Sequence, residues 1–440
     1  LRYPHEITNK INEVICCFNF LWENGTFMVF GDLINRQTSQ TKVNTMKVIT
    51  ILNDFLTKEI PSMHKIRKQA LLACVHSVVR DNELTVTAMG RGIDSNAREK
   101  HAIKRSDRLC SNINLYREKN HIYAAICKHW IPATARPVIL IDWSDLDECK
   151  NAFLISATLA YDGRPITLYQ EVHGINTKEK PTTHKAFMET LKSLLPKDCR
   201  PIIVTDAGFK IPWFKLVLSL GWDYVGRSRK PNFFSLNGEN WQSINVLFKK
   251  ATSTAKCFKG LLTKYKQYET TFVLYKNRAK GRQKLNKQGK RAQSKKSNHH
   301  AESGKEPWLL VTSLAVTSKL AKRVVKIYKK RMEIEEGYRD MKSEHYGLGF
   351  NASLSYKVTR IAILMLIAAL AAILLLIIGT AAEQAGLARH YQANTVKHRR
   401  VLSLHFLGKR VVKNSRLNLT LEDIQKAILH MHRIILTADR

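Results

Sequence analysis

Residues 361–378 form an unbroken run of 18 apolar residues, with Arg360 before it and Gly379 after it. A helix with this sequence is apolar on every side, so the folded protein must bury it on every side. About 18 such residues can also span a bilayer. Because the run is rich in alanine and nothing else in the chain suits a membrane, we expect a helix buried against a β-sheet. A membrane span is the alternative.

The charge of the chain is strongly basic. Its 440 residues include 72 Lys and Arg but 36 Asp and Glu, a formal net charge of +36. This balance favours a polyanionic partner, either nucleic acid or an anionic membrane. The eight cysteines contain no CxxC pair, so they indicate neither a zinc site nor a disulfide framework, and a reducing cytosol fits. Because the first residue is Leu1, we interpret residues 1–45 as an extension ahead of a start at Met46.

Residues 46–130 have a basic, helical pattern. Two short helices are expected at residues 82–91 and 96–109, joined by a turn near Gly90. The second carries Lys104, Arg105 and Arg108. A cationic second helix after such a turn can lie in a DNA groove, and a solvated basic face is the alternative. We predict a helical DNA-binding domain.

Two later apolar runs each end on an aspartate. Residues 138–141 lead into Asp142, and residues 201–205 lead into Asp206. Short continuous apolar runs are typical of buried strands. Asp145 and Asp147 compete with Asp142, but we expect them to lie beyond the end of the strand.

The order of elements around these aspartates favours an α/β fold. Strands at residues 153–161 and 166–172 flank a hairpin turn at Asp162 and Gly163, and a helix at residues 184–195 precedes the Asp206 strand. Gly208 is expected to open the next helix. This is the order of a ribonuclease-H-like mixed sheet, in which the first and fourth strands are adjacent. Both aspartates would then lie side by side.

Residues 227–306 interrupt this plan as a β-rich insertion. Within it, residues 276–296 hold ten Lys or Arg and no acid, which suits a DNA-contacting arm. Nuclear-localisation-like and solubilising roles are the alternatives. Trp308 begins the last strand, at residues 308–312. The predicted catalytic core therefore comprises residues 136–226 and 307–380, followed by a basic helical region at 381–440 with a helix at 420–436, for DNA contact or self-association.

A long helix is expected from an N-cap at Ser318 to Lys342. With about 100° of rotation per residue, one narrow stripe contains four polar residues: Tyr328, Arg331, Glu335 and Lys342. An adjacent apolar stripe is formed by Ile327, Ile334, Tyr338 and Met341. The other acids of the segment point elsewhere, so only Glu335 shares a face with the two cations.

Three carboxylates from separate elements, Asp142, Asp206 and Glu335, suit a pair of Mg²⁺ ions, because magnesium prefers oxygen ligands. Two such ions about 3.5–4 Å apart can activate an attacking oxygen and stabilise a leaving oxygen at phosphorus. Arg331 and Lys342 would neutralise DNA phosphates, and Tyr328 can hydrogen-bond a phosphate or stack on a base. The alternative without a functional role is that this segment is a solvent-exposed amphipathic helix.

These residues resemble the DDE transposases of bacterial insertion sequences, in the family called insertion sequence four. That family carries Tyr-x2-Arg-x3-Glu-x6-Lys, which this chain matches at every spacing. The segments at 141–145, 205–213, 305–308, 346–349 and 392–396 also resemble family members: IDWSD, TDAGFKIPW, KEPW, YGLG and QANTV.

The resemblance implies cut-and-paste transposition, with Asp142, Asp206 and Glu335 holding two Mg²⁺ or Mn²⁺ ions. A strand is nicked at the transposon end, a hairpin forms and reopens, and the freed end joins target DNA. Trp308 matches the position that holds a flipped base, although a core tryptophan is the alternative. A homodimer on terminal inverted repeats, in the bacterial cytoplasm at the nucleoid and with no membrane, is implied. A non-catalytic, transposase-derived DNA-binding protein is the competing function.

Overall fold

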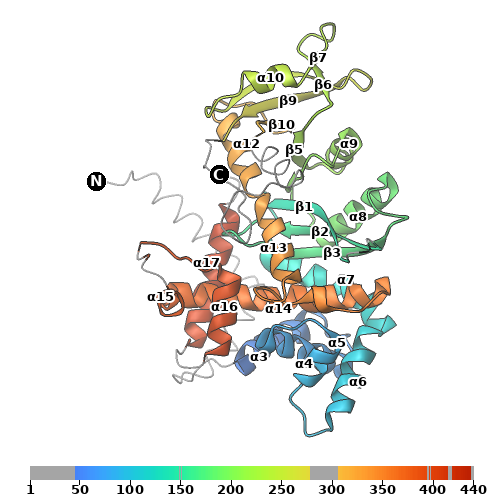
Figure 1. Cartoon of the computed structure of the whole chain (residues 1–440), viewed down its shortest axis with the longest axis vertical. Helices are drawn as coiled ribbons and strands as arrows, with labels where there is room; N and C mark the ends of the chain where they lie inside the picture. The colour runs from blue at the N-terminus through green and yellow to red at the C-terminus, as the bar shows by residue number, and fades with distance from the viewer. Residues whose placement is uncertain are drawn as a thin grey trace, which may run out of the picture.

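The chain folds as a mixed α/β protein (Figure 1). The computed structural model describes residues 45–147, 149, 151–277, 306–393, 396, 398–414 and 419–437. The predicted extension before residue 45 and the predicted basic arm beyond residue 277 lie outside these ranges. The N-terminal region is helical, as the sequence predicted, with α3 Thr45–Glu59, α4 Lys65–Asp81, α5 Val86–Arg91, α6 Glu99–Cys110 and α7 Ile113–Trp130.

The described residues form one large sheet in the order β3-β2-β1-β4-β5-β10-β9-β8-β6-β7. β1, β2 and β3 are antiparallel, whereas β4 lies parallel between β1 and β5. The predicted adjacency of the first and fourth strands is therefore confirmed. The strands are β1 Val138–Asp145, β2 Ala152–Leu159, β3 Ile166–Gly174, β4 Ile202–Val204, β5 Asp223–Ser228, β6 Phe233–Ser235, β7 Gln242–Ser243, β8 Lys256–Leu262, β9 Tyr268–Tyr275 and β10 Trp308–Thr312.

The β-rich insertion extends this sheet and does not interrupt it. β10 pairs with β5 on one side and with β9 on the other, both antiparallel. The strands of the insertion thereby continue the hydrogen-bonded ladder beyond the parallel strands. α10 Asn245–Lys249 lies beside them.

Two boundaries differ from the sequence expectation. β1 continues to Asp145, because its pairing with β2 extends to Asp145 opposite Phe153, so Asp145 lies inside the strand. Gly208 does not open a helix, since its N–H group donates to Asp206 Oδ1 at 2.8 Å in a turn. α9 Ile211–Ser219 begins after this turn, and α8 Pro181–Leu194 precedes β4.

The expected long helix is divided into α12 Leu320–Lys329 and α13 Met332–Lys342. At the junction, Lys330 N–H donates to Ile327 O and Arg331 N–H to Tyr328 O, which are the i→i−3 bonds of a tightened turn. The predicted N-cap was also wrong, since Lys319 occupies that position. Tyr328 therefore belongs to a different helix from Glu335.

The apolar run lies in α14 Val358–Gln384, which is buried along most of its length. Burial is confirmed, but β3 covers only part of the helix. The remaining cover comes from α4 and α7 of the N-terminal region and from α16 Leu404–Lys413 and α17 Leu421–Leu436 of the tail (Figure 1). By length and composition α14 alone among the described helices could cross a membrane, yet it is enclosed by the protein. Thr420 caps α17, as the helix predicted at 420–436 requires.

Candidate active site

Asp142 lies within β1, and Asp206 lies just beyond the end of the neighbouring strand β4. In the parallel pairing of β1 with β4, Leu140 is opposite Val204. Each aspartate follows two residues after this pair. Because side chains alternate between faces with a period of two, the Asp142 side chain projects from the same face of β1 as Leu140.

The Asp142 carboxylate is largely enclosed, with 16% of its side chain exposed. Burial and the neighbouring Asp206 raise the pKa of Asp142 to about 7, against the opposing effect of Arg331. Its Oδ1 accepts a hydrogen bond from the backbone N–H of Trp143 at 2.9 Å. The Trp143 indole itself donates to His184 Nε2 at 3.1 Å, so this side chain packs away from the carboxylates.

Arg331 connects the strand carboxylate with the helix carboxylate. Its Nη1 lies 3.5 Å from Asp142 Oδ2, and its Nη2 lies 2.5 Å from Glu335 Oε1. Burial lowers the pKa of Arg331, but Tyr328, Glu335 and Asp142 together raise it above its usual value, so the guanidinium stays charged. Arg331 and Glu335 thus share one face, as the stripe predicted.

Three further hydrogen bonds, from two side chains, attach α13 to β1. The Tyr338 hydroxyl donates to Asp142 O at 2.6 Å. Lys342 Nζ donates to Ser144 Oγ at 2.8 Å and to Asp145 O. Lys342 therefore contacts the strand that carries Asp142, and burial lowers its pKa.

Tyr328 and Trp308 lie together near the carboxylates. Their ring centroids are 5.0 Å apart in an edge-to-face arrangement, and Arg331 Cζ is 6.0 Å from the Tyr328 ring centroid. Tyr328 is buried, whereas Trp308 is half-buried at the start of β10. Burial raises the pKa of Tyr328, and its charged neighbours include Arg331, Arg227 and Asp206.

Arg227 on β5 is a cation of this site that sequence reasoning missed. Its side chain is 13% exposed, and its Nη2 lies 2.9 Å from Glu306 Oε2. Burial lowers the pKa of Arg227, and Tyr328 and Arg331 are both close enough to affect it. No sequence pattern marked it, because a single arginine near the end of a strand has no distinctive spacing.

The three basic residues predicted on the N-terminal helix lie elsewhere. α6 carries Lys104 and Arg108 exposed and Arg105 half-buried. In Figure 1, α14 lies between α6 and the strands of the carboxylates. α5 crosses α6 closely, since a Cβ on Gly90 would be 2.4 Å from Ile103 Cα, so the two predicted short helices do pack together.

Among the described residues, no three His, Cys, Asp or Glu side chains surround one point closely enough to hold a single ion. The carboxylates are instead linked in pairs through Asp142. Asp206 is close enough to Asp142 to raise its pKa, and Glu335 is joined to Asp142 through Arg331.

A comparison with protein families decides the relationship of the chain. The family described as Transposase DDE domain matches residues 133–374, more than half of the chain. The chain belongs to the DDE transposase family. The matched part contains both aspartates and α13, whereas the helices before residue 133 and the tail lie outside it. No match was found among curated proteins.

Proposed function

We propose that the protein is a DNA transposase of the insertion sequence four family, of the Tn-ten type, that moves an insertion sequence by metal-dependent phosphoryl transfer. The observation that carries this proposal is the position of Asp142 on β1 and of Asp206 just beyond the adjacent parallel strand β4, with Arg331 joining Asp142 to Glu335. The five strands from β3 to β5 then form a ribonuclease-H-like core.

The side chains fit divalent metal ions. All three candidate ligands offer carboxylate oxygens, which Mg²⁺ and Mn²⁺ prefer. Burial of Asp142 beside Asp206 makes its negative charge costly without a cation, as its raised pKa indicates. Asp142, Asp206 and Glu335 would hold two ions. When bound, such ions activate the attacking oxygen and stabilise the leaving oxygen at phosphorus.

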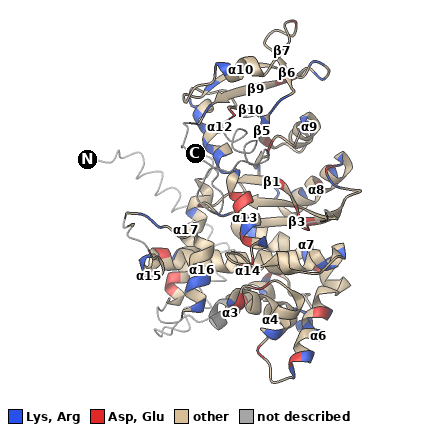
Figure 2. Ribbon diagram, in the orientation of Figure 1, with Lys and Arg blue, Asp and Glu red and all other residues tan. Residues whose placement is uncertain are grey.

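Cations and aromatic rings around the carboxylates would hold DNA. Arg331 and Arg227 supply positive charge for phosphate oxygens, and Tyr328 supplies a hydroxyl beside them. Lys342 fixes the strand and helix together through Ser144. Trp308 is exposed enough to stack on an unpaired base. Figure 2 shows Lys and Arg residues on α6 at one end of the molecule and on α10 and α12 toward the other, so duplex DNA could contact both.

The reaction proposed from the family resemblance has three stages. Water attacks a phosphodiester at the transposon end and releases a 3′-hydroxyl. This hydroxyl attacks the opposite strand to form a hairpin, which a second water opens. The same 3′-hydroxyl finally attacks target DNA. The protein would act as a homodimer bound to terminal inverted repeats, in the bacterial cytoplasm at the nucleoid.

Cleavage of a supercoiled plasmid that carries the gene with its genomic flanks tests this proposal. We expect Mg²⁺-dependent nicking at the flanks, and its loss in Asp142→Asn, Asp206→Asn and Glu335→Gln. Matched controls are Asp145→Asn, on the same strand but paired with Lys178, and Glu344→Gln, which is exposed beyond α13. Both should cut like the wild type.

The competing function is DNA binding without chemistry. It is favoured by the absence of a three-ligand group among the described residues and by the position of Arg331 between two of the carboxylates. Tight binding of the flank DNA by the wild type, with no cleavage in either Mg²⁺ or Mn²⁺, would establish this function in place of the first.

A further inference from the structure

The acids of α13 that the helical pattern placed away from Glu335 have a common partner. Glu333, Glu336 and Asp340 occupy the opposite side of the helix, and all three contact the hairpin turn between β2 and β3. This turn comprises residues 161–165, with Gly163 in the left-handed conformation at φ 77°. α13 therefore has two polar faces, one toward the candidate active site and one toward the hairpin.

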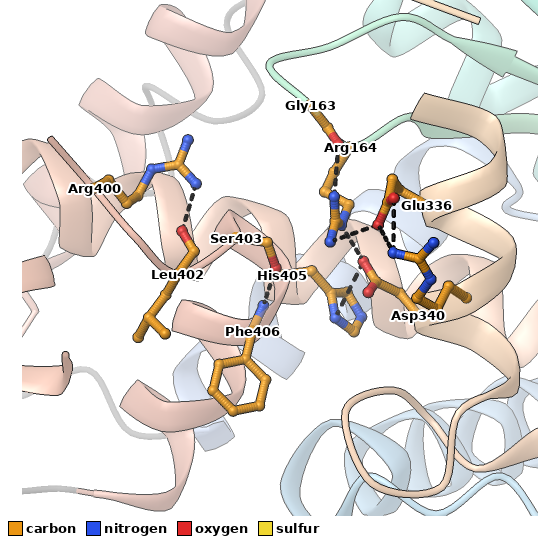
Figure 3. A network of polar contacts seen from close by, with 10 residues as sticks. Gly163, Arg164, Glu336, Asp340, Arg400, Leu402, Ser403, His405 and Phe406 are labelled. Carbon is orange, nitrogen blue, oxygen red and sulfur yellow. Dashed lines mark hydrogen bonds and ion pairs between the residues drawn. The ribbon is translucent and has the colours of Figure 1, made fainter. Parts of the chain in front are cut away.

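Arg164 is the centre of the second face (Figure 3). Its Nε lies 2.5 Å from Asp340 Oδ2, its Nη2 lies 3.3 Å from Glu336 Oε2, and its Nη1 donates to Gly163 O at 2.9 Å. The side chains of Arg164, Glu336 and Asp340 are 18%, 24% and 11% exposed. Ion pairs this enclosed are directional, because each nitrogen must meet its oxygen to offset the lost hydration.

Residues on either side of Arg164 also join the hairpin turn to α13. One helical turn earlier, Glu333 Oε2 accepts a hydrogen bond from the backbone N–H of Tyr161 at 2.7 Å. Between the acids, Gly337 lies against Pro165, where a Cβ would be 2.8 Å from Pro165 Cγ. The spacing of the acids corresponds to one side of a helix, so the whole length of α13 follows the hairpin.

Apolar packing on this side of the helix is incomplete. A cavity with a volume of about 50 Å³ lies beside α13, and its lining includes Arg164, Gly337, Asp340 and His405. His405 of α16 lies 3.8 Å from Asp340, but its two ring nitrogens have no hydrogen-bond partner among the described residues. The ion pairs of Arg164 therefore join α13 to the hairpin beside this cavity, in addition to the hydrogen bonds that Tyr338 and Lys342 make to β1.

We propose that Arg164, through Glu336 and Asp340, is a positioning residue that fixes the rotation of α13 and therefore the point at which Glu335 faces Asp142. The proposal rests on the proposed function, since it assigns Arg164 a part in assembling that site. A rotation of α13 moves Glu335 and Arg331 together, because both are on its other face. Displacement of a reacting group by about 1 Å can slow a reaction on the order of 100-fold.

Arg164→Ala tests this positioning role against a matched ion pair elsewhere. Arg67 and Glu118 form a two-fold hydrogen-bonded pair between α4 and α7, with side chains 14% and 24% exposed, distant from α13 in the chain. We expect Arg164→Ala to slow single-turnover plasmid cleavage about 10- to 100-fold and to raise the Mg²⁺ concentration for half-maximal rate. The Kd for flank DNA should not change. Arg67→Ala should lower thermal stability and leave rate and Mg²⁺ requirement unchanged.

A second control addresses Glu336 itself. Arg339 also pairs with Glu336, at 2.7 Å, but it belongs to α13 and is 65% exposed, so it does not connect α13 to the hairpin. Arg339→Ala should behave like the wild type. The double variant Arg164→Ala/Asp340→Ala should lose no more activity than Arg164→Ala alone, because the two side chains act as one unit.

Amide hydrogen exchange gives a readout that does not require activity. In Arg164→Ala, amides of α13 should exchange faster while those of α14 do not change. Arg164→Lys keeps the positive charge, so its cleavage rate and its α13 exchange should lie between those of the wild type and Arg164→Ala. This variant is the substitute if Arg164→Ala does not fold. Unchanged exchange and cleavage in a folded variant would overturn the positioning role. A wild type that cuts no DNA would instead overturn the proposed function, and the exchange of α13 would still decide whether Arg164 anchors the helix.

Discussion

α13 and α14 follow one another in the chain but are held in opposite ways. α14 is apolar on all sides and is enclosed by β3, by N-terminal helices and by the tail. α13 is mostly polar, and its neighbours hold it by hydrogen bonds and ion pairs on two faces. Apolar burial is non-directional, whereas ion pairs and hydrogen bonds specify orientation. One helix therefore provides stability, and the other provides the geometry of the candidate site.

The largest expected effect comes from the close crossing of α14 with α16. A Cβ on Gly379 would lie 1.9 Å from Leu404 O, and one on Gly408 would lie 2.1 Å from Leu375 O. Because backbone cannot yield to a methyl group, Gly379→Ala and Gly408→Ala force the helices apart. We expect each to cost more than about 3 kcal/mol of unfolding free energy, measured by chemical denaturation.

Gly174→Ala is the control for these two substitutions. Its new Cβ would come no closer than 3.9 Å to Asn151 O, so stability should change little. If Gly379→Ala were as stable as Gly174→Ala, α14 and α16 would not cross as closely as the structure has them. The tail would then not be part of the core that covers α14.

The contrast also explains what the sequence could predict. A run of 18 apolar residues specifies that α14 is buried, but its composition does not name the elements that cover it, so the tail helices were not expected there. Helical spacing placed Arg331 and Glu335 on one face correctly, because Arg331 is the N-cap of α13 and has helical backbone angles. The break at Lys330 was missed, since no glycine or proline marks it.

Contacts between residues distant in sequence could not be predicted from the spacing of apolar and charged residues. Arg164 is far from Asp340 in sequence, and nothing in either local segment connects them. Arg227 was missed for the same reason, because it comes near Tyr328 only when α12 packs on β5 in the folded protein. The adjacency of β1 and β4, which brings Asp142 near Asp206, could be predicted because each aspartate follows a short apolar run in the sequence.

A second prediction concerns pH and the cover of α14. His432 of α17 is buried and stacks on Trp130, with ring centroids 5.0 Å apart, and burial together with the adjacent His129 lowers the pKa of His432 to about 3. The unfolded histidine has a pKa of about 6.5. The unfolded chain therefore binds the proton first as the pH falls, and stability decreases from about pH 6.5 downward.

At pH 5 this linkage amounts to about 2 kcal/mol for His432. We expect thermal stability to be constant above about pH 7 and to fall as the buffer is taken to pH 5. His432→Phe retains the stacked ring without a titrating group, so its stability should fall less over the same range. An equal fall in both proteins would show that other groups, such as His129, account for the dependence.

The smallest effect on stability is expected from a substitution in α13, and it tests directly whether the polar contacts of this helix serve the candidate site. Tyr338→Phe removes one hydroxyl, which donates to Asp142 O at 2.6 Å. Loss of a single hydrogen bond costs about 1 kcal/mol. Because this bond joins α13 to the strand of Asp142, plasmid cleavage should fall by more than the small loss of stability would explain.

Tyr356→Phe is the matched control, since Tyr356 is 80% exposed between α13 and α14 and makes no comparable bond among the described residues. It should change neither stability nor cleavage. If Tyr338→Phe lost stability but cut DNA at the wild-type rate, hydrogen bonds of α13 would serve stability alone. Both helices would then only stabilise the fold, one by polar contacts and the other by apolar burial. The hydrogen bonds of α13 would not set the position of Glu335.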